Sequence, residues 1–264
     1  MQDQFETILL ERKADHLLLI TLNRPEAGNS MNTRMGEELR NLWSNLYCNQ
    51  DDIRCIVLTG SGDRIFCAGA DLKERNNMSD KQWMAQHALF EQMILAEMDC
   101  PIPIIAAING AAYAGGFEMT LGCDFVYAAK RARFALTEVT LGIMPGACGT
   151  QNLPRAVGVR RAKEIILTGE PLTAKQAYEW GIVNKLCEDD ELLSDALTTA
   201  NRICQNAPIS IRQAKKSINM SQQVDTKSGY MFELEAYNRM VTTEDRVEGI
   251  RAFNEKRMAK FEGR

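Results

Sequence analysis

The order of apolar runs and helix-like stretches constrains the fold of this chain more than any other feature. Apolar runs suited to β-strands occur at residues 17–22, 54–59 and 103–108, and helix-like stretches follow them. After Pro154 the pattern is helical, apart from one β-like run at residues 182–186. Strands that alternate with helices early, followed by helices late, predict an α/β core with a helical C-terminal region.

The same patterns give expected bounds for individual elements. We expect a hairpin from residues 5–11 and 17–22, and a helix from a cap at Asn32 or Thr33 to about residue 47. Further helices are expected at 80–97, 158–168, 173–180, 190–206, 208–220 and 229–257, and further strands at 125–128 and 133–136. We divide the chain into a core over residues 1–200 and a helical region over residues 201–264.

Composition argues against several classes of function. The chain has 264 residues, 45% hydrophobic and 25% charged, which is ordinary for a globular protein. Its net charge of −4 gives no general reason to expect nucleic acid as a partner. No apolar run is long enough to span a membrane, and residues 1–4 resemble neither a signal peptide nor a transit segment. We therefore expect a cytoplasmic protein.

Cysteine and histidine usage argues against a metal site. The eight cysteines form no CxxC pair and do not cluster with His16 or His87. Several, such as Cys55, lie inside apolar runs, where a free cysteine packs as a small hydrophobic residue. We expect reduced thiols, no bound metal and no chemistry centred on histidine.

Two glutamates, Glu118 and Glu138, lie in apolar and glycine-flanked surroundings. A carboxylate among apolar groups is costly unless it is paired, hydrogen-bonded or protonated. If both side chains face one pocket, they can divide acid and base work between them. The alternative is that both are ordinary surface glutamates, which is the usual situation for this residue.

Two glycine-bearing loops each follow an apolar strand and precede a helix, one at residues 69–71 and the other at 114–116. Backbone N–H groups at a helix start are unpaired and lie at the positive end of its dipole. Two such groups aimed at one point form an oxyanion hole. Each loop is also compatible with an ordinary strand-to-helix turn. Neither matches a phosphate-binding Walker A or GxGxxG motif.

Several motifs occur in an order that resembles one known family. They are Asn23-Arg24-Pro25-Glu26-Ala27, Phe66-Cys67-Ala68-Gly69-Ala70-Asp71-Leu72-Lys73, Ile105-Ala106-Ala107-Ile108-Asn109-Gly110 with Gly115-Gly116-Phe117-Glu118, and Pro145-Gly146-Ala147-Cys148-Gly149-Thr150-Gln151. Together with the tail at residues 248–257, they resemble the enoyl-CoA hydratase/isomerase (crotonase) superfamily over essentially the whole chain.

The resemblance implies a crotonase-like spiral of ββα units, followed by helices that pack on neighbouring subunits. Such proteins are usually trimers paired into hexamers, so we expect a homotrimer or homohexamer. The resemblance also implies a coenzyme A thioester as substrate. Coenzyme A then enters as part of the substrate, and no separate cofactor is expected.

The resemblance assigns roles to individual positions. The backbone N–H groups of Ala70 and Gly115 would hold the thioester oxygen, and Glu118 and Glu138 would be the catalytic pair. Substrate or coenzyme A contacts fall on Ala27, Ala68, Asp71, Leu72, Lys73, Gly146, Phe253 and Lys256, the last two reaching in from an adjacent subunit. The sequence departs from the family pattern at Ala114 and Cys148, where glycine is common, and at Asn152, where arginine is common.

Retention of both glutamates favours hydration over isomerisation, because isomerases of this family commonly keep only the position of Glu138. We expect reversible syn addition of water to a 2-enoyl-CoA. Local segments look closest to methylglutaconyl-CoA hydratases of leucine breakdown, with a general short-chain hydratase as the neighbouring possibility. A glutaconyl substrate needs a partner for its distal carboxylate, and Lys73, Arg75 and Lys81 are candidates. The alternatives are an isomerase, or a non-catalytic coenzyme A- or RNA-binding relative.

Overall fold

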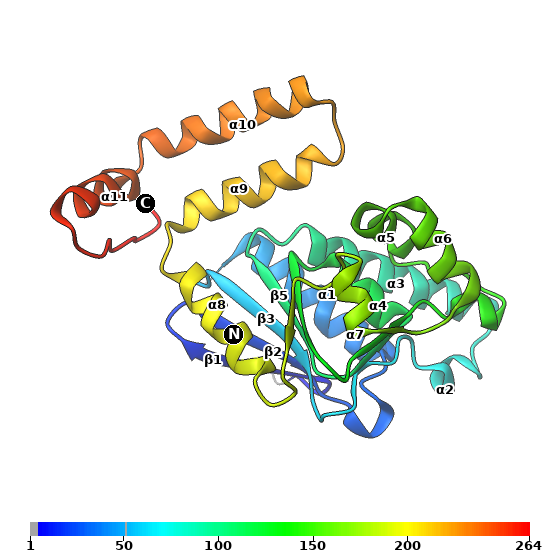
Figure 1. The fold of residues 1–264 in the computed structure, drawn as a ribbon. Coiled ribbons are helices and arrows are strands. Elements are labelled where there is room, and N and C mark those ends of the chain that lie inside the picture. The colour runs from blue at the N-terminus through cyan, green and yellow to red at the C-terminus, as the bar shows by residue number, and fades with distance from the viewer. Residues whose placement is uncertain (1–4, 51) are drawn as a thin grey trace.

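A computed structural model describes residues 5–50 and 52–264, so residues 1–4 of the expected N-terminus lie outside the described part. Its larger sheet has the strand order β1-β2-β3-β5-β7-β10 (Figure 1). These strands are β1 (Ile8–Ala14), β2 (Leu17–Leu22), β3 (Cys55–Gly60), β5 (Ile104–Ile108), β7 (Phe125–Ala129) and β10 (Lys185–Cys187). β1 and β2 form the expected antiparallel hairpin, and the remaining neighbours pair in parallel.

A smaller sheet has the order β4-β6-β8-β9. Its strands are β4 (Ile65–Cys67), β6 (Ala111–Tyr113), β8 (Arg133–Ala135) and β9 (Leu172–Thr173). The pairs β3/β4, β5/β6 and β7/β8 each give one strand to the larger sheet and the next to the smaller sheet, and each is followed by helical structure. This repeat is the expected ββα spiral of an α/β protein.

Helices cover both faces of the larger sheet, which explains why β3 and β5 are continuous apolar runs rather than alternating ones. On one face α1 (Thr33–Cys48) packs against α3 (Asp80–Met98), and both contribute to the main core. On the other face α8 (Leu192–Cys204) buries its apolar side against β2, β3, β5 and β7. Asn32 caps α1 by accepting a hydrogen bond from the N–H of Met35.

The last helices leave the body as an arm (Figure 1). They are α9 (Pro208–Ser221), α10 (Thr226–Val241) and α11 (Glu244–Glu255). We predicted one helix over residues 229–257, which is wrong, because α10 ends at Val241 and Thr243 caps a new helix by accepting a hydrogen bond from the N–H of Arg246. Residue 200 lies inside α8, and the division of the chain at that residue stays a prediction.

The remaining elements are short, and only some of them had expected bounds. These are the strands β4, β6 and β9, the helices α2 (Leu72–Arg75), α4 (Gly115–Gly122), α5 (Gly149–Val157), α6 (Val159–Thr168) and α7 (Ala174–Glu179) in their observed bounds, and the 3₁₀ turns η1 (Pro25–Ala27) and η2 (Glu138–Leu141). Of these, α6 and α7 match the helices expected at 158–168 and 173–180, and α4, which begins at Gly115, is the helix expected at the loop 114–116.

Candidate active site

One cavity of about 480 Å³ brings together both glutamates and both glycine-bearing loops. It lies where the loop after β4, the start of α4, the turn η2 and one face of α3 meet. Its lining is mostly apolar. The residues are Met31, Ala68, Ala70, Leu72, Arg75, Trp83, His87, Phe90, Met93, Ala114, Gly115, Glu118, Thr137, Glu138, Leu141, Ile143, Met144, Pro145, Gly146 and Ala147.

Close backbone packing holds the two loops side by side. A Cβ placed on Gly69 would come within 2.7 Å of the Ala114 Cβ and 3.3 Å of the Gly115 nitrogen. Gly69 also has a φ of +93°, which a residue with a side chain rarely adopts. Glycine is therefore required here for both conformation and space, and it lets the loop carrying Ala70 reach the start of α4.

Met31 fixes the backbone direction on either side of Ala70. Its N–H donates to the Gly69 carbonyl at 2.7 Å, and its carbonyl accepts from the Asp71 N–H at 2.9 Å. Backbone N–H and C=O groups of successive residues point to opposite sides of an extended segment, so the N–H of Ala70, between Gly69 and Asp71, points away from Met31. Gly115 is the first residue of α4, and N–H groups in the first turn have no carbonyl partner within the helix.

The side chain of Glu118 is buried and is held by hydrogen bonds from backbone N–H groups. Its Oε1 accepts hydrogen bonds from the N–H groups of Ala147 at 2.8 Å and Gly149 at 2.9 Å. Cys148, between these donors, has a left-handed conformation (φ 69°, ψ 7°), so the two N–H groups converge on one oxygen. Burial raises the pKa of Glu118, and the backbone donors oppose that rise by stabilising the charged form.

Glu138 has a different environment. It begins η2, its side chain is 6% exposed, and its Oε2 is a buried atom without a hydrogen-bond partner within the described residues. Burial raises the pKa of Glu138 to about 7, and the nearby charge of Glu118 contributes in the same direction. The two carboxyl groups therefore differ, since Glu118 has donors that favour its charged form and Glu138 is readily protonated near neutral pH.

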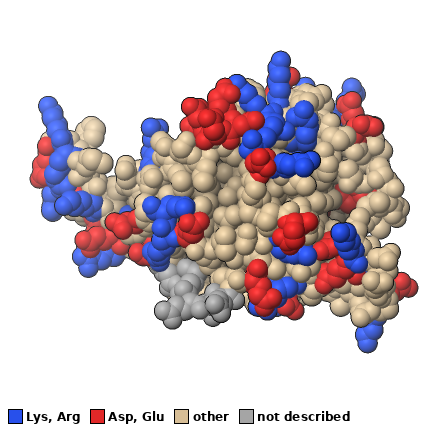
Figure 2. All heavy atoms as spheres, turned by 90° about the horizontal axis from the view of Figure 1, so that it is seen from below, with Lys and Arg blue, Asp and Glu red and all other residues tan. Residues whose placement is uncertain are grey.

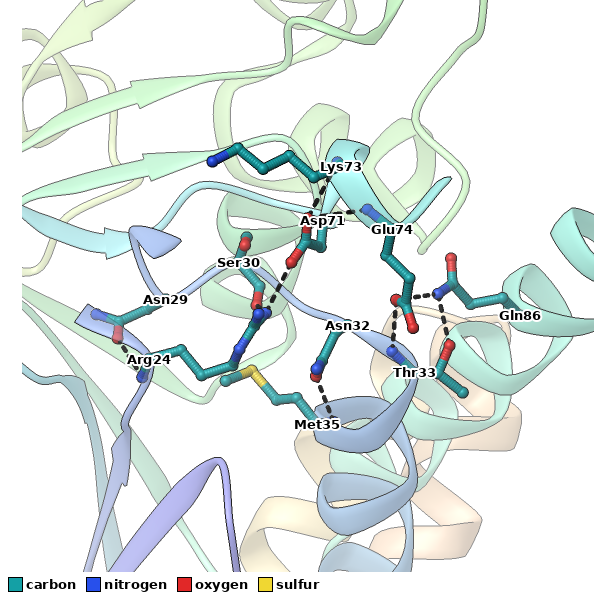
Figure 3. A network of polar contacts seen from close by, with 10 residues as sticks. All are labelled: Arg24, Asn29, Ser30, Asn32, Thr33, Met35, Asp71, Lys73, Glu74 and Gln86. Atoms are coloured by element: carbon teal, nitrogen blue, oxygen red, sulfur yellow. Dashed lines mark hydrogen bonds and ion pairs between the residues drawn. The ribbon is translucent and has the colours of Figure 1, made fainter. Parts of the chain in front are cut away.

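The cavity includes most of the residues that the sequence placed in the site. Besides the glutamates, Ala68, Ala70, Leu72, Gly115 and Gly146 line it. Asp71 and Lys73 belong to the same segment but do not line it. Asp71 caps α2, accepting from the N–H groups of Lys73 and Glu74, and pairs with Arg24 at 3.0 Å (Figure 3). Lys73 is exposed.

Three other expected contacts lie outside the cavity. Ala27 ends η1 and is partly buried. Phe253 is 83% exposed on α11, and Lys256 follows it as the left-handed residue that ends this helix. Both lie on the projecting arm, well away from α2 and α3 (Figure 1). Their assigned roles stay predictions.

The sequence reading missed one wall of the cavity. Trp83, His87 and Phe90 lie on one face of α3, and their spacing of four and three residues is the available signal. We read His87 as structural. It lies partly exposed at the cavity, with Nε2 3.2 Å from Glu91 Oε1. Within the described residues, no three His, Cys, Asp or Glu side chains are grouped so that they could hold a metal ion.

A ββα spiral that brings two buried carboxyl groups and two glycine-bearing loops to one apolar cavity defines the class of crotonase-fold proteins. The family model for enoyl-CoA hydratase/isomerase matches residues 12–264. The chain therefore belongs to the enoyl-CoA hydratase/isomerase family.

Relatives match over nearly the whole chain. YngF of Bacillus subtilis (strain 168), whose name assigns it provisionally to this family, is 42% identical over 258 residues, covering 98% of this chain and 99% of its own. The 2,3-dehydroadipyl-CoA hydratase of Escherichia coli (strain K12) is 39% identical over 257 residues, covering 97% and 99%. The crystal structure of enoyl-CoA hydratase from Bacillus anthracis superimposes with a TM-score of 0.96 at 41% identity, covering 98% and 100%.

Proposed function

We propose that this protein is an enoyl-CoA hydratase, which adds water reversibly across the 2,3-double bond of a coenzyme A thioester. The observation that carries the proposal is the pair of buried glutamates with unlike environments on one cavity, beside Ala70 and Gly115. An isomerase that moves a double bond needs one group to carry a proton, whereas addition of water needs one to activate water and one to protonate carbon.

The environments of the glutamates support separate roles. Glu118, held by the N–H groups of Ala147 and Gly149, would act as the base that orients and deprotonates water. Glu138, with its raised pKa, would deliver a proton to the α-carbon. The N–H groups of Ala70 and Gly115 would stabilise the negative charge that develops on the thioester oxygen. In dehydration the two carboxyl groups would exchange roles.

The identity of the substrate's acyl group is a finer part of this proposal. We retain 3-methylglutaconyl-CoA, an intermediate of leucine breakdown, as the candidate substrate that the sequence favours. The E. coli relative is named for 2,3-dehydroadipyl-CoA, which like methylglutaconyl-CoA is the thioester of a dicarboxylic acid. The mostly apolar lining around Met31, Leu141 and Ile143 suits a short unsaturated chain next to the reacting carbons.

The proposal also includes expectations about cofactors and binding partners. Coenzyme A would enter with the substrate, and no other cofactor is invoked. We expect a homotrimer or homohexamer and no nucleic acid. The face in Figure 2 supports the last point, because acidic and basic side chains are intermixed on it rather than gathered into a basic strip. No helix among residues 5–50 and 52–264 is long and apolar enough to cross a membrane.

Hydration of crotonyl-CoA, followed by the loss of absorbance of the conjugated thioester, tests this function. Glu118→Gln and Glu138→Gln should each lower kcat by about a hundredfold to ten-thousandfold, because each removes acid–base catalysis. Glu164→Gln, an exposed glutamate on α6, is the matched control and should keep the wild-type rate. If Glu118→Gln abolished hydration but still shifted the double bond of a 3-enoyl-CoA, Glu138 alone would carry the proton. Near-normal hydration by both variants would refute the proposal.

A further inference from the structure

Arg75 is a buried cation on the wall of the cavity. It is the last residue of α2, its side chain is only 7% exposed, and it lies beside the apolar lining residues. Its guanidinium carbon lies 4.3 Å from the centre of the Trp83 ring and 5.5 Å from that of Phe90. Both rings belong to α3, so the planar group is held in a defined orientation by stacking.

Only part of this guanidinium is used by the protein. Its Nε donates to Gln86 Oε1 at 2.8 Å. Among the described residues, no carboxylate forms an ion pair with Arg75, and neither of its Nη nitrogens makes a hydrogen bond. Burial lowers the pKa of Arg75, whereas the charge of Glu74 opposes this change. A buried charge without a directly paired carboxylate is unfavourable, so a bound anion would stabilise this arrangement.

Glu74, the acidic side chain whose charge acts on Arg75, already accepts hydrogen bonds from other groups. Glu74 Oε2 accepts from the Thr33 N–H at 2.9 Å and from Gln86 Nε2 at 2.8 Å (Figure 3). Gln86 therefore links the two charged residues, with its Oε1 toward Arg75 and its Nε2 toward Glu74. This network fixes the guanidinium and leaves its two Nη groups for a ligand with two acceptor oxygens.

We infer that Arg75 binds a carboxylate at the end of the acyl chain remote from the thioester, so that the preferred substrates are mono-thioesters of unsaturated dicarboxylic acids. This inference rests on the proposed hydratase function. The structure also distinguishes Arg75 from the other two candidate partners of a distal carboxylate, because Lys73 and Lys81 are exposed and do not line the cavity. Arg75 would be a specificity-determining residue, because a bidentate guanidinium–carboxylate pair rewards only substrates that carry the second carboxylate.

The test compares glutaconyl-CoA with pent-2-enoyl-CoA, which has the same number of acyl carbons but no distal carboxylate. The wild-type kcat/KM should favour glutaconyl-CoA by about tenfold or more. Arg75→Met should lower the value for glutaconyl-CoA by about a hundredfold and change the value for pent-2-enoyl-CoA by less than about threefold. Arg75→Lys keeps the charge without the planar guanidinium, so its kcat/KM for glutaconyl-CoA should lie between those of the wild type and Arg75→Met. Lys81→Met removes an exposed charge nearby and should match the wild type.

The outcomes are distinguishable. If the wild type hydrates neither thioester, the proposed hydratase function fails. If it hydrates pent-2-enoyl-CoA at least as well as glutaconyl-CoA, the hydratase function stands and the role of Arg75 is refuted. An equal loss on both substrates in Arg75→Met would show instead that Arg75 serves the fold or coenzyme A. The wild-type comparison can refute the inference even if Arg75→Met fails to fold, which circular dichroism would report.

Discussion

Ala114 and Cys148 have backbone conformations that favour glycine. Ala114 has φ 50° and ψ −126°, and Cys148 has φ 69° and ψ 7°. Both are positions where the sequence departs from the glycine common in the family. Ala114 precedes the first turn of α4, and Cys148 lies between the two N–H groups that hold Glu118. The family's glycines therefore have a conformational reason, and this chain tolerates strain at both sites of its active-site backbone.

Replacing Ala114 with glycine should stabilise the protein. The substitution relieves the strain of a side chain at positive φ, which costs about 1–3 kcal/mol, and loses about 0.4–1 kcal/mol through the freer unfolded chain. We expect a net gain of about 1 kcal/mol in the free energy of unfolding, measured by urea denaturation. Ala112→Gly, on buried β6 with ordinary backbone, is the control and should destabilise. A loss of stability in both variants would contradict this account.

Glu97 is a second buried carboxyl group, and the proposed mechanism does not use it. Its side chain is fully buried, Cys123 Sγ donates to Oε1 at 3.3 Å, and Oε2 has no partner within the described chain. Burial raises the pKa of Glu97 to about 8, although the thiol hydrogen bond and Lys215 oppose the rise. The folded protein therefore keeps a proton there that the unfolded chain releases above the ordinary value of 4.5.

This proton makes stability depend on pH with a definite sign. The stabilising contribution of Glu97 to the free energy of unfolding is fully present below pH 4.5. It falls at higher pH as the unfolded state ionises, and it is lost as pH rises through about 8. Glu97→Gln, which cannot ionise, should flatten the decline in thermal midpoint between pH 5 and pH 9. Glu179→Gln, an exposed glutamate on α7, should leave the decline unchanged. A decline equally steep in both variants would show that Glu97 is not its source.

At the scale of elements, the ion pair between Arg24 and Asp71 links the turn η1 to the loop that carries Ala70. Arg24 Nη1 donates to the Ser30 carbonyl at 2.6 Å and to Asp71 Oδ2 at 3.0 Å, and both side chains are mostly buried (Figure 3). Burial alone would raise the pKa of Asp71, but hydrogen bonds from Arg24 and the Glu74 N–H lower it overall. The pair holds the backbone on one side of Ala70, so we regard Asp71 as a positioning residue.

Asp71→Ala should therefore affect turnover more than binding. Loss of the pair and of the α2 cap would let the Ala70 N–H leave its place, and a misplaced oxyanion donor costs about a hundredfold in kcat. We expect a kcat that is ten- to hundredfold lower with KM changed by less than about threefold. Asp71→Asn keeps an acceptor for the cap and should recover part of the rate. A rise in KM alone would instead assign Asp71 to coenzyme A binding.

Element length decided how much of the fold the sequence could predict. Runs such as 54–59 and 103–108 were recognisable because burial on both faces makes every residue apolar. The strands β4, β6 and β9 are too short to show a period, and only pairing with neighbours far along the chain defines them. Residues 229–257 looked like one helix because helix-compatible residues continue across Thr243, whose capping role depends on its backbone conformation.

The candidate site was predictable to a similar extent. Glu118 and Glu138 stood out because carboxylates are rare in apolar segments, and their shared cavity agrees with that reasoning. The sequence alone could not show that Arg75, rather than Lys73 or Lys81, is the candidate partner for a distal carboxylate. It depends on how α2 turns against Trp83 and Phe90 of α3, which is a matter of packing between elements.

At the scale of the whole molecule, the arm exposes many large apolar side chains. Five large apolar residues on α10 are between 43% and 63% exposed: Tyr230, Met231, Leu234, Tyr237 and Val241. On α11, Ile250 and Phe253 are 53% and 83% exposed. Exposed apolar residues gathered on two helices are typical of an interface, and this supports the proposed homo-oligomer. The tail returns to the body, where Arg54 donates to the Phe261 carbonyl at 2.7 Å.

If the arm completes a neighbour's site, two defective chains should repair each other. Chains with Glu138→Gln keep Phe253 and Lys256 but lack the acid, whereas Phe253→Ala/Lys256→Ala chains keep the acid but lack the arm contacts. The first alone should be inactive, and the second alone should show a raised KM for acyl-CoA. Purified mixed assemblies from co-expression should contain some sites with wild-type KM, because an intact arm reaches an intact pair of glutamates. If the arm served only its own chain, the mixture would show the raised KM alone, and the exposed position of Phe253 would need another explanation.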